Sequence, residues 1–209
     1  MPLVALIAAL HLLAAARPKP TLHLVGRDVS PEYRHERLRW LATHEGGHTI
    51  AAWCCPFVGT VQNVSVKPAS GNGPVLWTGV TNHDWIVEHG TPEHLWWDMI
   101  ISLAGLAAEV ATYGRIVTLP PRKDIDDALT SVRTLCSKRG CFTGYAPPIP
   151  LDVPCTPAEA AALGYAWNKA TEILAAHRAA HALLTEALIV DRALSSANLT
   201  AILGPRTSS

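Results

Sequence analysis

Residues 30–54 of this 209-residue chain read SPEYRHERLRWLATHEGGHTIAAWC, and this stretch is the most informative part of the sequence for the fold. Ser30 followed by Pro31 is typical of a helix start, because a serine hydroxyl caps free backbone N–H groups and proline suits the first helical position. Pro56 stops the same helix, since proline removes a backbone donor and clashes with the preceding turn. We therefore expect one helix from Pro31 to about Cys54.

This helix contains the motif His44-Glu45-Gly46-Gly47-His48. Two histidines four residues apart on a helix project from one face, so both imidazoles can ligate a single Zn²⁺ ion. Such an ion lowers the pKa of a bound water to about 7, and Glu45 is placed to take the proton from that water. The motif predicts zinc-dependent peptide hydrolysis, with His44 and His48 as ligands and Glu45 as general base. The two glycines favour either a locally weak helix or a close approach of another backbone or a substrate.

A site of this kind needs a third protein ligand, and spacing leaves two candidates open. Glu109 lies in AGLAAE (104–109), on a helix that we expect to start at Thr91-Pro92 and to end at Gly114. Asp124 stands at the start of a further helix, after a proline-rich loop. Neither position is favoured by spacing alone.

The remaining pattern predicts a small sheet and a helical C-terminal part. The β-branched residues 61–67 favour a strand, and a Gly/Pro cluster after Pro68 favours a turn into a second strand over 75–80. Thr156-Pro157-Ala158-Glu159 predicts a capping box that starts a long helix towards His181. Further expected elements are a short strand near 22–25, a helix around 182–189 and a short helix near 197–203. The fold class is α+β and mainly α-helical, in one domain.

Composition excludes some function classes. Seventeen Lys and Arg balance seventeen Asp and Glu, so the chain is not a broadly basic nucleic-acid binder. The five cysteines have no regular spacing and no CxxC pair, which favours free thiols and a reducing, cytoplasmic compartment. Residues 3–16 are nearly all apolar but reach about 21 Å as a helix, short of a roughly 30 Å hydrocarbon core. A docking or core helix, a membrane anchor and a cleaved signal all stay open for this segment.

Other histidines carry weaker signals. His177 and His181 are also four apart, but no acid lies between them, and we expect a structural or solvent role. His83, His89 and His94 lie in a polar, tryptophan-rich stretch. We interpret them as surface residues, with a place at the rim of the site as the alternative.

From about Leu41 to Leu203 the chain resembles the peptidase domain of FtsH-type AAA zinc metalloproteases. HEGGH (44–48) resembles the family's HEAGH, and AGLAAE (104–109), with Gly114 after it, resembles its GGRAAEE helix. VQNVSVKP (61–68) is similar to its strand before a Pro-Arg-Gly turn. KDIDDA (123–128) is similar to its Asn-Asp-(Ile/Leu)-x-x-Ala block, and residues 166–203 follow its closing helices.

The resemblance implies a zincin-like metallopeptidase domain with a small sheet and a C-terminal helical bundle. It makes Asp124 the third zinc ligand and leaves Glu109 to orient a ligand histidine. It also makes the strand with Val64, Ser65 and Val66 the edge to which an unfolded polypeptide adds. The sequence departs from the family at Gly46 and Thr49, where alanine is usual, at Val110, where a second glutamate is usual, and in the turn before Asp124.

The sequence contains no GxxxxGK[ST] loop, so it lacks the family's ATPase half. We divide it into a leading segment (1–20), a metallopeptidase domain (21–204) and a tail (205–209). The expected activity is that of a zinc metalloendopeptidase acting on unfolded or flexible polypeptides. The alternative is a non-catalytic or regulatory subunit that binds an ATPase-bearing partner. A separate AAA ATPase and a homo-oligomer are the partners that the resemblance suggests.

Overall fold

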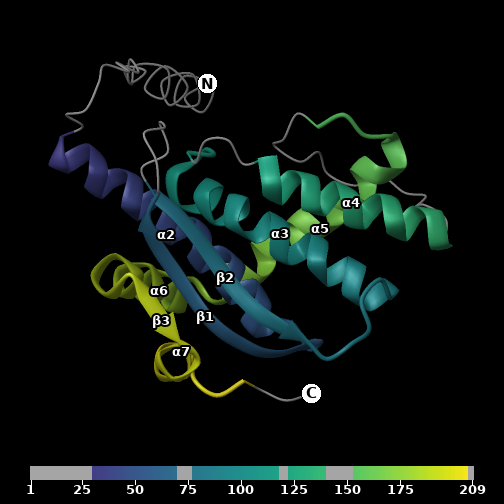
Figure 1. Ribbon diagram of the computed structural model, residues 1–209. Coiled ribbons are helices and arrows are strands. Elements are labelled where there is room, and N and C mark those ends of the chain that lie inside the picture. The colour runs from purple at the N-terminus through teal and green to yellow at the C-terminus, as the bar shows by residue number, and fades with distance from the viewer. Residues whose placement is uncertain (1–29, 70–76, 118–121, 140–152, 207–209) are drawn as a thin grey trace, which may run out of the picture.

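The computed structural model describes residues 30–69, 77–117, 122–139 and 153–206. Helices dominate, and one small antiparallel sheet lies beside them (Figure 1). The expected α+β, mainly helical class is confirmed. In chain order the elements are α2 (Pro31–Cys54), β1 (Val58–Pro68), β2 (Trp77–Trp85), α3 (Pro92–Tyr113), α4 (Arg122–Arg139), α5 (Pro157–Ala176), α6 (Arg178–Asp191), β3 (Ala193–Ser195) and α7 (Ser196–Leu203).

Capping residues start the helices where the sequence predicts. The side-chain oxygens of Ser30, Thr91 and Thr156 each accept a hydrogen bond from a backbone N–H three residues later. Thr156 also forms the expected capping box with Glu159. Gly114 ends α3 with a φ of 70°, a left-handed conformation that glycine adopts without a Cβ penalty.

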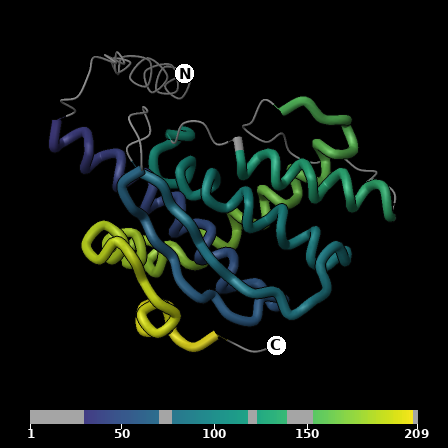
Figure 2. Tube along the Cα trace, in the orientation of Figure 1, coloured from purple at the N-terminus to yellow at the C-terminus, as the bar shows by residue number. Residues whose placement is uncertain are grey.

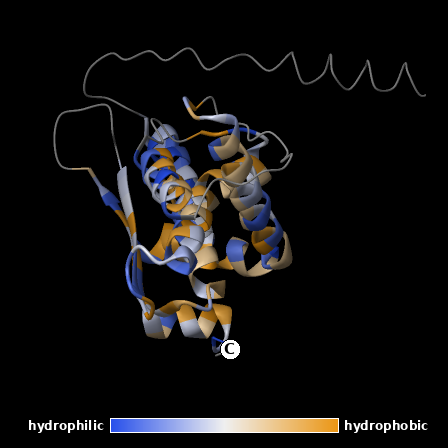
Figure 3. Cartoon of the chain, turned by 90° about the vertical axis from the view of Figure 1, so that its right-hand side faces the viewer, coloured by the Kyte–Doolittle hydropathy of each residue, from blue (hydrophilic) through white to orange (hydrophobic). Residues whose placement is uncertain are grey.

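Helices α2 and α3 cross closely at the centre of the molecule. A Cβ atom on Gly47 would lie only 2.4 Å from the carbonyl oxygen of Ala104, so a side chain at position 47 would force the two helices apart. Of the two interpretations of the motif glycines, a locally weak helix or a close approach of another backbone, Gly47 fits the close approach. Figure 3 shows apolar residues along the helices that pack together. Helix α3 is long and apolar enough to span a membrane, but 67% of its most apolar stretch is buried inside the protein.

The sheet has the strand order β2-β1-β3, and this order corrects one expectation. Val64 pairs with Thr81 on β2 and with Leu194 on β3, while the N–H of Val66 donates to the carbonyl of Arg192 at 2.8 Å. Val64, Ser65 and Val66 therefore lie in the central strand and are not an edge. The physical reason is that the chain returns after α6 and lays β3 along the outer side of β1. Within the described residues, β2 pairs on one side only.

In the C-terminal part, the helices end and begin at other residues than the sequence predicts. The long helix α5 ends at Ala176 and not at His181, because the chain bends by 83° at His177 into α6. Strand β3 was not predicted, and the short helix after it is confirmed as α7. Figure 2 shows these C-terminal elements, in yellow, on the side of β1 that faces away from β2.

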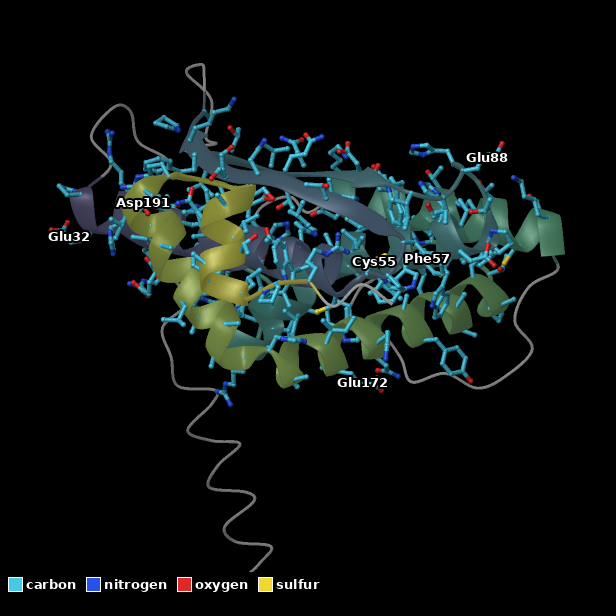
Figure 4. All side chains as sticks on the ribbon, turned by 90° about the horizontal axis from the view of Figure 1, so that it is seen from below. Glu32, Cys55, Phe57, Glu88, Glu172 and Asp191 are labelled. Atoms are coloured by element: carbon cyan, nitrogen blue, oxygen red, sulfur yellow. The ribbon has the colours of Figure 1, made fainter. Side chains whose placement is uncertain are left out.

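Arg206 ties the end of the chain to the end of α2. Its guanidinium donates to the carbonyl oxygens of Trp53 at 3.0 Å, Cys55 at 2.6 Å and Gly59 at 2.6 Å. Figure 4 labels Cys55 in this turn between α2 and β1. The positive charge thus sits at the carbonyl end of the helix that carries the HEGGH motif, where a cation is electrostatically favoured.

The cysteines are only in part as expected. Cys54, Cys55 and Cys155 are free thiols, but Cys136 is disulfide-bonded, so the expectation of five free cysteines is wrong there. Pairing depends on which thiols the fold brings together, and irregular spacing does not exclude it. The expectations for residues 1–20 and for the strand near 22–25 lie outside the described residues.

Candidate metal centre

The two motif histidines meet as their spacing predicts. His44 and His48 lie one turn apart on α2, and their Nε2 atoms are 2.9 Å apart. Both residues are buried, at 5% and 8% exposure. The early part of α2 is exposed and its second half buried, so the motif lies where the helix enters the core.

The third member of the group comes from the first turn of α4. Asp124 places Oδ2 2.9 Å from His44 Nε2 and Oδ1 3.7 Å from His48 Nε2. One ligand atom from each of the three residues lies within 4.8 Å of the others. The protein therefore holds a buried His44–His48–Asp124 group that can bind a metal ion. Of the two candidates that spacing left open, the structure brings Asp124 into this group.

Glu109 lies behind the first histidine. Its side chain is fully buried, and Oε1 accepts a hydrogen bond from His44 Nδ1 at 2.6 Å. Its other oxygen accepts from the backbone N–H of Val117 at 2.5 Å, in the segment that leads towards α4. Glu109 thus orients the His44 ring and steadies the approach to Asp124, a common role of a carboxylate beside a metal ligand.

The hydrogen bonds of the two rings decide where their protons lie. A carbonyl only accepts, so His48 Nδ1, which is 2.7 Å from the carbonyl oxygen of Ile101, carries the proton. The Glu109 carboxylate likewise accepts a hydrogen bond from His44, so Nδ1 of that ring carries a proton too. The Nε2 atom of each ring then points towards the other ring and towards Asp124. Three electron-rich atoms meet in one buried place, which calls for a positive charge between them.

The pKa shifts of His44 and Asp124 also favour a positive charge in this group. Burial by itself lowers the pKa of His44, but the hydrogen bonds to Asp124 and Glu109 outweigh it and raise this pKa to about 10. Burial raises the pKa of Asp124, and the hydrogen bonds to His44 and His48 outweigh it, so the pKa lies well below its usual range. In the metal-free protein a proton therefore supplies the charge.

Glu45 is buried beside this group and is not one of its ligands. Its Oε2 accepts a hydrogen bond from the Thr81 hydroxyl of β2 at 3.0 Å. A Cβ atom on Gly79 would lie 2.4 Å from Glu45 Oε1, so the glycine leaves the space in which the carboxylate rests. The carboxylate is thus held between the metal-binding helix and strand β2.

Gly105 of α3 leaves space on the other side. A Cβ atom there would lie 2.6 Å from His48 Nε2 and 2.7 Å from His44 Nε2, the two atoms that face the centre. Gly105, Gly79 and Thr81 were not predicted as site residues. The alternation of β2 was the available signal for two of them, because residues 79 and 81 share its inward face.

The other histidines have structural places. His181 Nε2 donates to the carbonyl oxygen of Thr43 at 2.9 Å, so α6 is tied to α2, whereas His177 is exposed. The expectation that His83 and His94 are surface residues is wrong for His94, which is buried, and only partly right for His83, which is half-buried. They were misplaced because β2 and the start of α3 pack their rings around Trp85. His89 is exposed, and its ring packs at a tilt against His94.

No protein-family model matches this sequence, and no curated protein sequence matches it.

Proposed function

We propose that the protein is a zinc-dependent metalloendopeptidase of the FtsH peptidase type. The observation that carries this proposal is the convergence of the two imidazole Nε2 atoms and the Asp124 carboxylate in one buried group, with the Glu45 carboxylate beside it. Two imidazoles and one carboxylate are a ligand set that suits catalytic zinc, which uses three protein ligands and keeps a fourth position open. Bound at these residues, zinc would acidify a water molecule and polarise the scissile carbonyl.

The chain's own residues supply the proton transfers. Glu45 accepts a proton from the attacking water and then passes it to the nitrogen of the leaving amine. Its carboxylate is buried, and the bond from Thr81 fixes one of its oxygens. Glu109 keeps the His44 ring in the orientation that aims Nε2 at the centre, and the Ile101 carbonyl does the same for His48.

An extended substrate backbone fits the free side of β2. This strand pairs only with β1 among the described residues, and its inward residues Gly79 and Thr81 contact Glu45. A polypeptide segment that adds to β2 through main-chain hydrogen bonds would therefore pass the general base. Main-chain pairing requires an unfolded or flexible segment and makes few demands on its sequence. This strand replaces residues 64–66 of β1 as the proposed substrate edge.

Zinc content and cleavage of an unstructured protein test the proposal together. We expect about one zinc per chain, and we expect Glu45→Gln to keep the zinc while lowering the cleavage rate by about 10³-fold, within the range for loss of a general base. Glu36→Gln is the matched control, because Glu36 lies on the same helix and is exposed. Equal cleavage by Glu45→Gln and the wild type would overturn the proposal.

A further inference from the structure

We propose that Thr81 is a positioning residue that sets the direction of the Glu45 carboxylate; this inference rests on the proposed peptidase function. Thr81 lies on the inward face of β2, opposite α2. Among the described residues, its hydroxyl makes the one hydrogen bond that reaches the Glu45 carboxylate. The bond links Thr81, which the sequence analysis did not predict as a site residue, to Glu45, the expected general base.

The protons of two threonine hydroxyls can be assigned. Thr49 Oγ1 lies 2.8 Å from the backbone oxygen of Glu45, one helical turn earlier, and that carbonyl can only accept, so Thr49 donates to it. Thr81 Oγ1 lies 3.2 Å from Thr49 Oγ1, 3.3 Å from the same backbone oxygen and 3.0 Å from Glu45 Oε2. A carboxylate is the strongest of these acceptors and also the nearest. The single Thr81 proton therefore goes to Glu45 Oε2.

Gly79 completes the support for the carboxylate. The glycine leaves room for Glu45 Oε1 on the same face of β2 on which Thr81 holds Oε2. A glutamate side chain otherwise has several rotamers, and ordering it costs free energy that the hydroxyl offsets. A general base must reach the proton it takes to within about 2.6–3.2 Å, and a misplacement of about 1 Å can cost a factor of 10² in rate.

The position of Thr81 also links the base to the substrate. The strand that carries the hydroxyl is β2, which pairs only with β1 in the part of the chain that the structure describes. A substrate backbone paired to β2 and the Glu45 carboxylate bonded to β2 are therefore both positioned by the same strand. The Thr81 contribution falls on the chemical step, because the hydroxyl touches Glu45 and its loss leaves the backbone of β2 in place.

Three variants separate this role from a structural one. Thr81→Val removes the hydroxyl but keeps a β-branched side chain of similar size, Thr81→Ser keeps the hydroxyl, and Thr60→Val is the control at an exposed position of the neighbouring strand β1. We expect Thr81→Val to lower kcat by roughly 10- to 100-fold with KM within about twofold of the wild type. Thr81→Ser recovers most of kcat, and Thr60→Val leaves both constants unchanged. Should Thr81→Val fail to fold, Thr81→Ala gives the same comparison.

A second measurement needs no bound metal. In the metal-free protein, a double-mutant cycle between Thr81→Val and Glu45→Ala measures their coupling in urea unfolding. We expect the two changes to be non-additive by roughly tenfold to a hundredfold in the unfolding equilibrium constant, as for a hydrogen bond to a carboxylate. Additive effects would overturn the assignment of the bond.

The outcomes distinguish the two proposals. A wild type that cleaves nothing, or a Glu45→Gln variant as active as the wild type, overturns the peptidase function and with it the role of Thr81. An active wild type and an inactive Glu45→Gln, together with Thr81→Val at the wild-type kcat, overturn the Thr81 inference alone. A loss in Thr81→Val that Thr81→Ser does not recover, or that appears in KM only, overturns it as well.

Discussion

Gly105→Ala is expected to close the space in which the metal would sit. The added Cβ would lie 2.6 Å from His48 Nε2, about 0.8 Å short of the 3.4 Å at which ordinary van der Waals contact begins. It would lie 2.7 Å from both Cε1 and Nε2 of His44. Zinc–nitrogen bonds of about 2.0–2.1 Å tolerate errors of only about 0.2 Å. Both rings would have to move by several times this tolerance.

The expected loss of zinc affinity is at least about 100-fold, or about 2.8 kcal/mol, because changes beside the ligands alone cost 10- to 100-fold and this change displaces the ligands themselves. The helix itself does not oppose the substitution, since alanine is favoured over glycine within a helix by about 1 kcal/mol. The metal-free variant should therefore still fold, which circular dichroism would check. Zinc affinity is measured by competition with a chelator of known affinity.

Gly46→Ala is the matched control on the motif itself. Its nearest neighbours would be the His181 ring, at 3.1 Å, and Thr185 Oγ1, at 3.4 Å, and neither belongs to the metal-binding group. Zinc affinity within about threefold of the wild type is expected, since neither ligand ring is displaced. If Gly105→Ala bound zinc as tightly as Gly46→Ala does, the Nε2 atoms of His44 and His48 would not be the ligand atoms, and the reasoning from this geometry would fail.

Further predictions concern the third ligand, the pH dependence of zinc binding and the contacts of Arg206. Asp124→Ala should lower zinc affinity by about 10³-fold, and Glu109→Ala by about 10- to 100-fold, because the first removes a ligand and the second only the support of one; the reverse order in a calorimetric titration would show that the third ligand is misassigned. Because the pKa of His44 is about 10 without metal, zinc must displace a proton, and its affinity should rise about tenfold per pH unit between pH 7 and 9. A zinc affinity that does not depend on pH would contradict this raised pKa of His44. The raised pKa also stabilises the metal-free fold: the contribution to the free energy of unfolding is fully present below pH 6.5 and is lost as the pH rises through about 10. Arg206→Ala should lower the free energy of unfolding in urea by about 1–2 kcal/mol, since three carbonyl oxygens lose a partly exposed charged donor, whereas Arg178→Ala, at an exposed position, should change it by less than about 0.5 kcal/mol.

The helices could be predicted from the sequence because their signals are local. A capping hydroxyl, a proline in the first turn and a glycine after the last turn all act within four residues. Helices α2 and α3 therefore begin and end where these residues stand. The bend at His177 could not be found this way, since neither glycine nor proline marks it and α6 turns there to pack against α2 through His181.

The sheet shows the opposite case. The β-branched residues predicted β1, and the Gly/Pro cluster after it predicted a second strand in the region of β2, but nothing in the sequence predicted β3. Three residues of β3, more than a hundred positions later, pair with the stretch that was expected to be an edge. The edge character of a strand is a property of its neighbours, and a single strand's sequence does not contain it.

The sequence by itself determined that His44 and His48 share one face of a helix with Glu45 beside them, because the 3.6-residue period of a helix turns a spacing of four into proximity. Only the tertiary structure decided that Asp124, eighty residues from His44, completes the group and that Glu109 stands behind His44. It also decided that β2, next to Glu45, pairs on one side only among the described residues, whereas β1 is central. The physical reason is that contacts between distant segments depend on how the helices and the sheet pack, and two candidate carboxylates with equally good local signals differ only in where that packing places them.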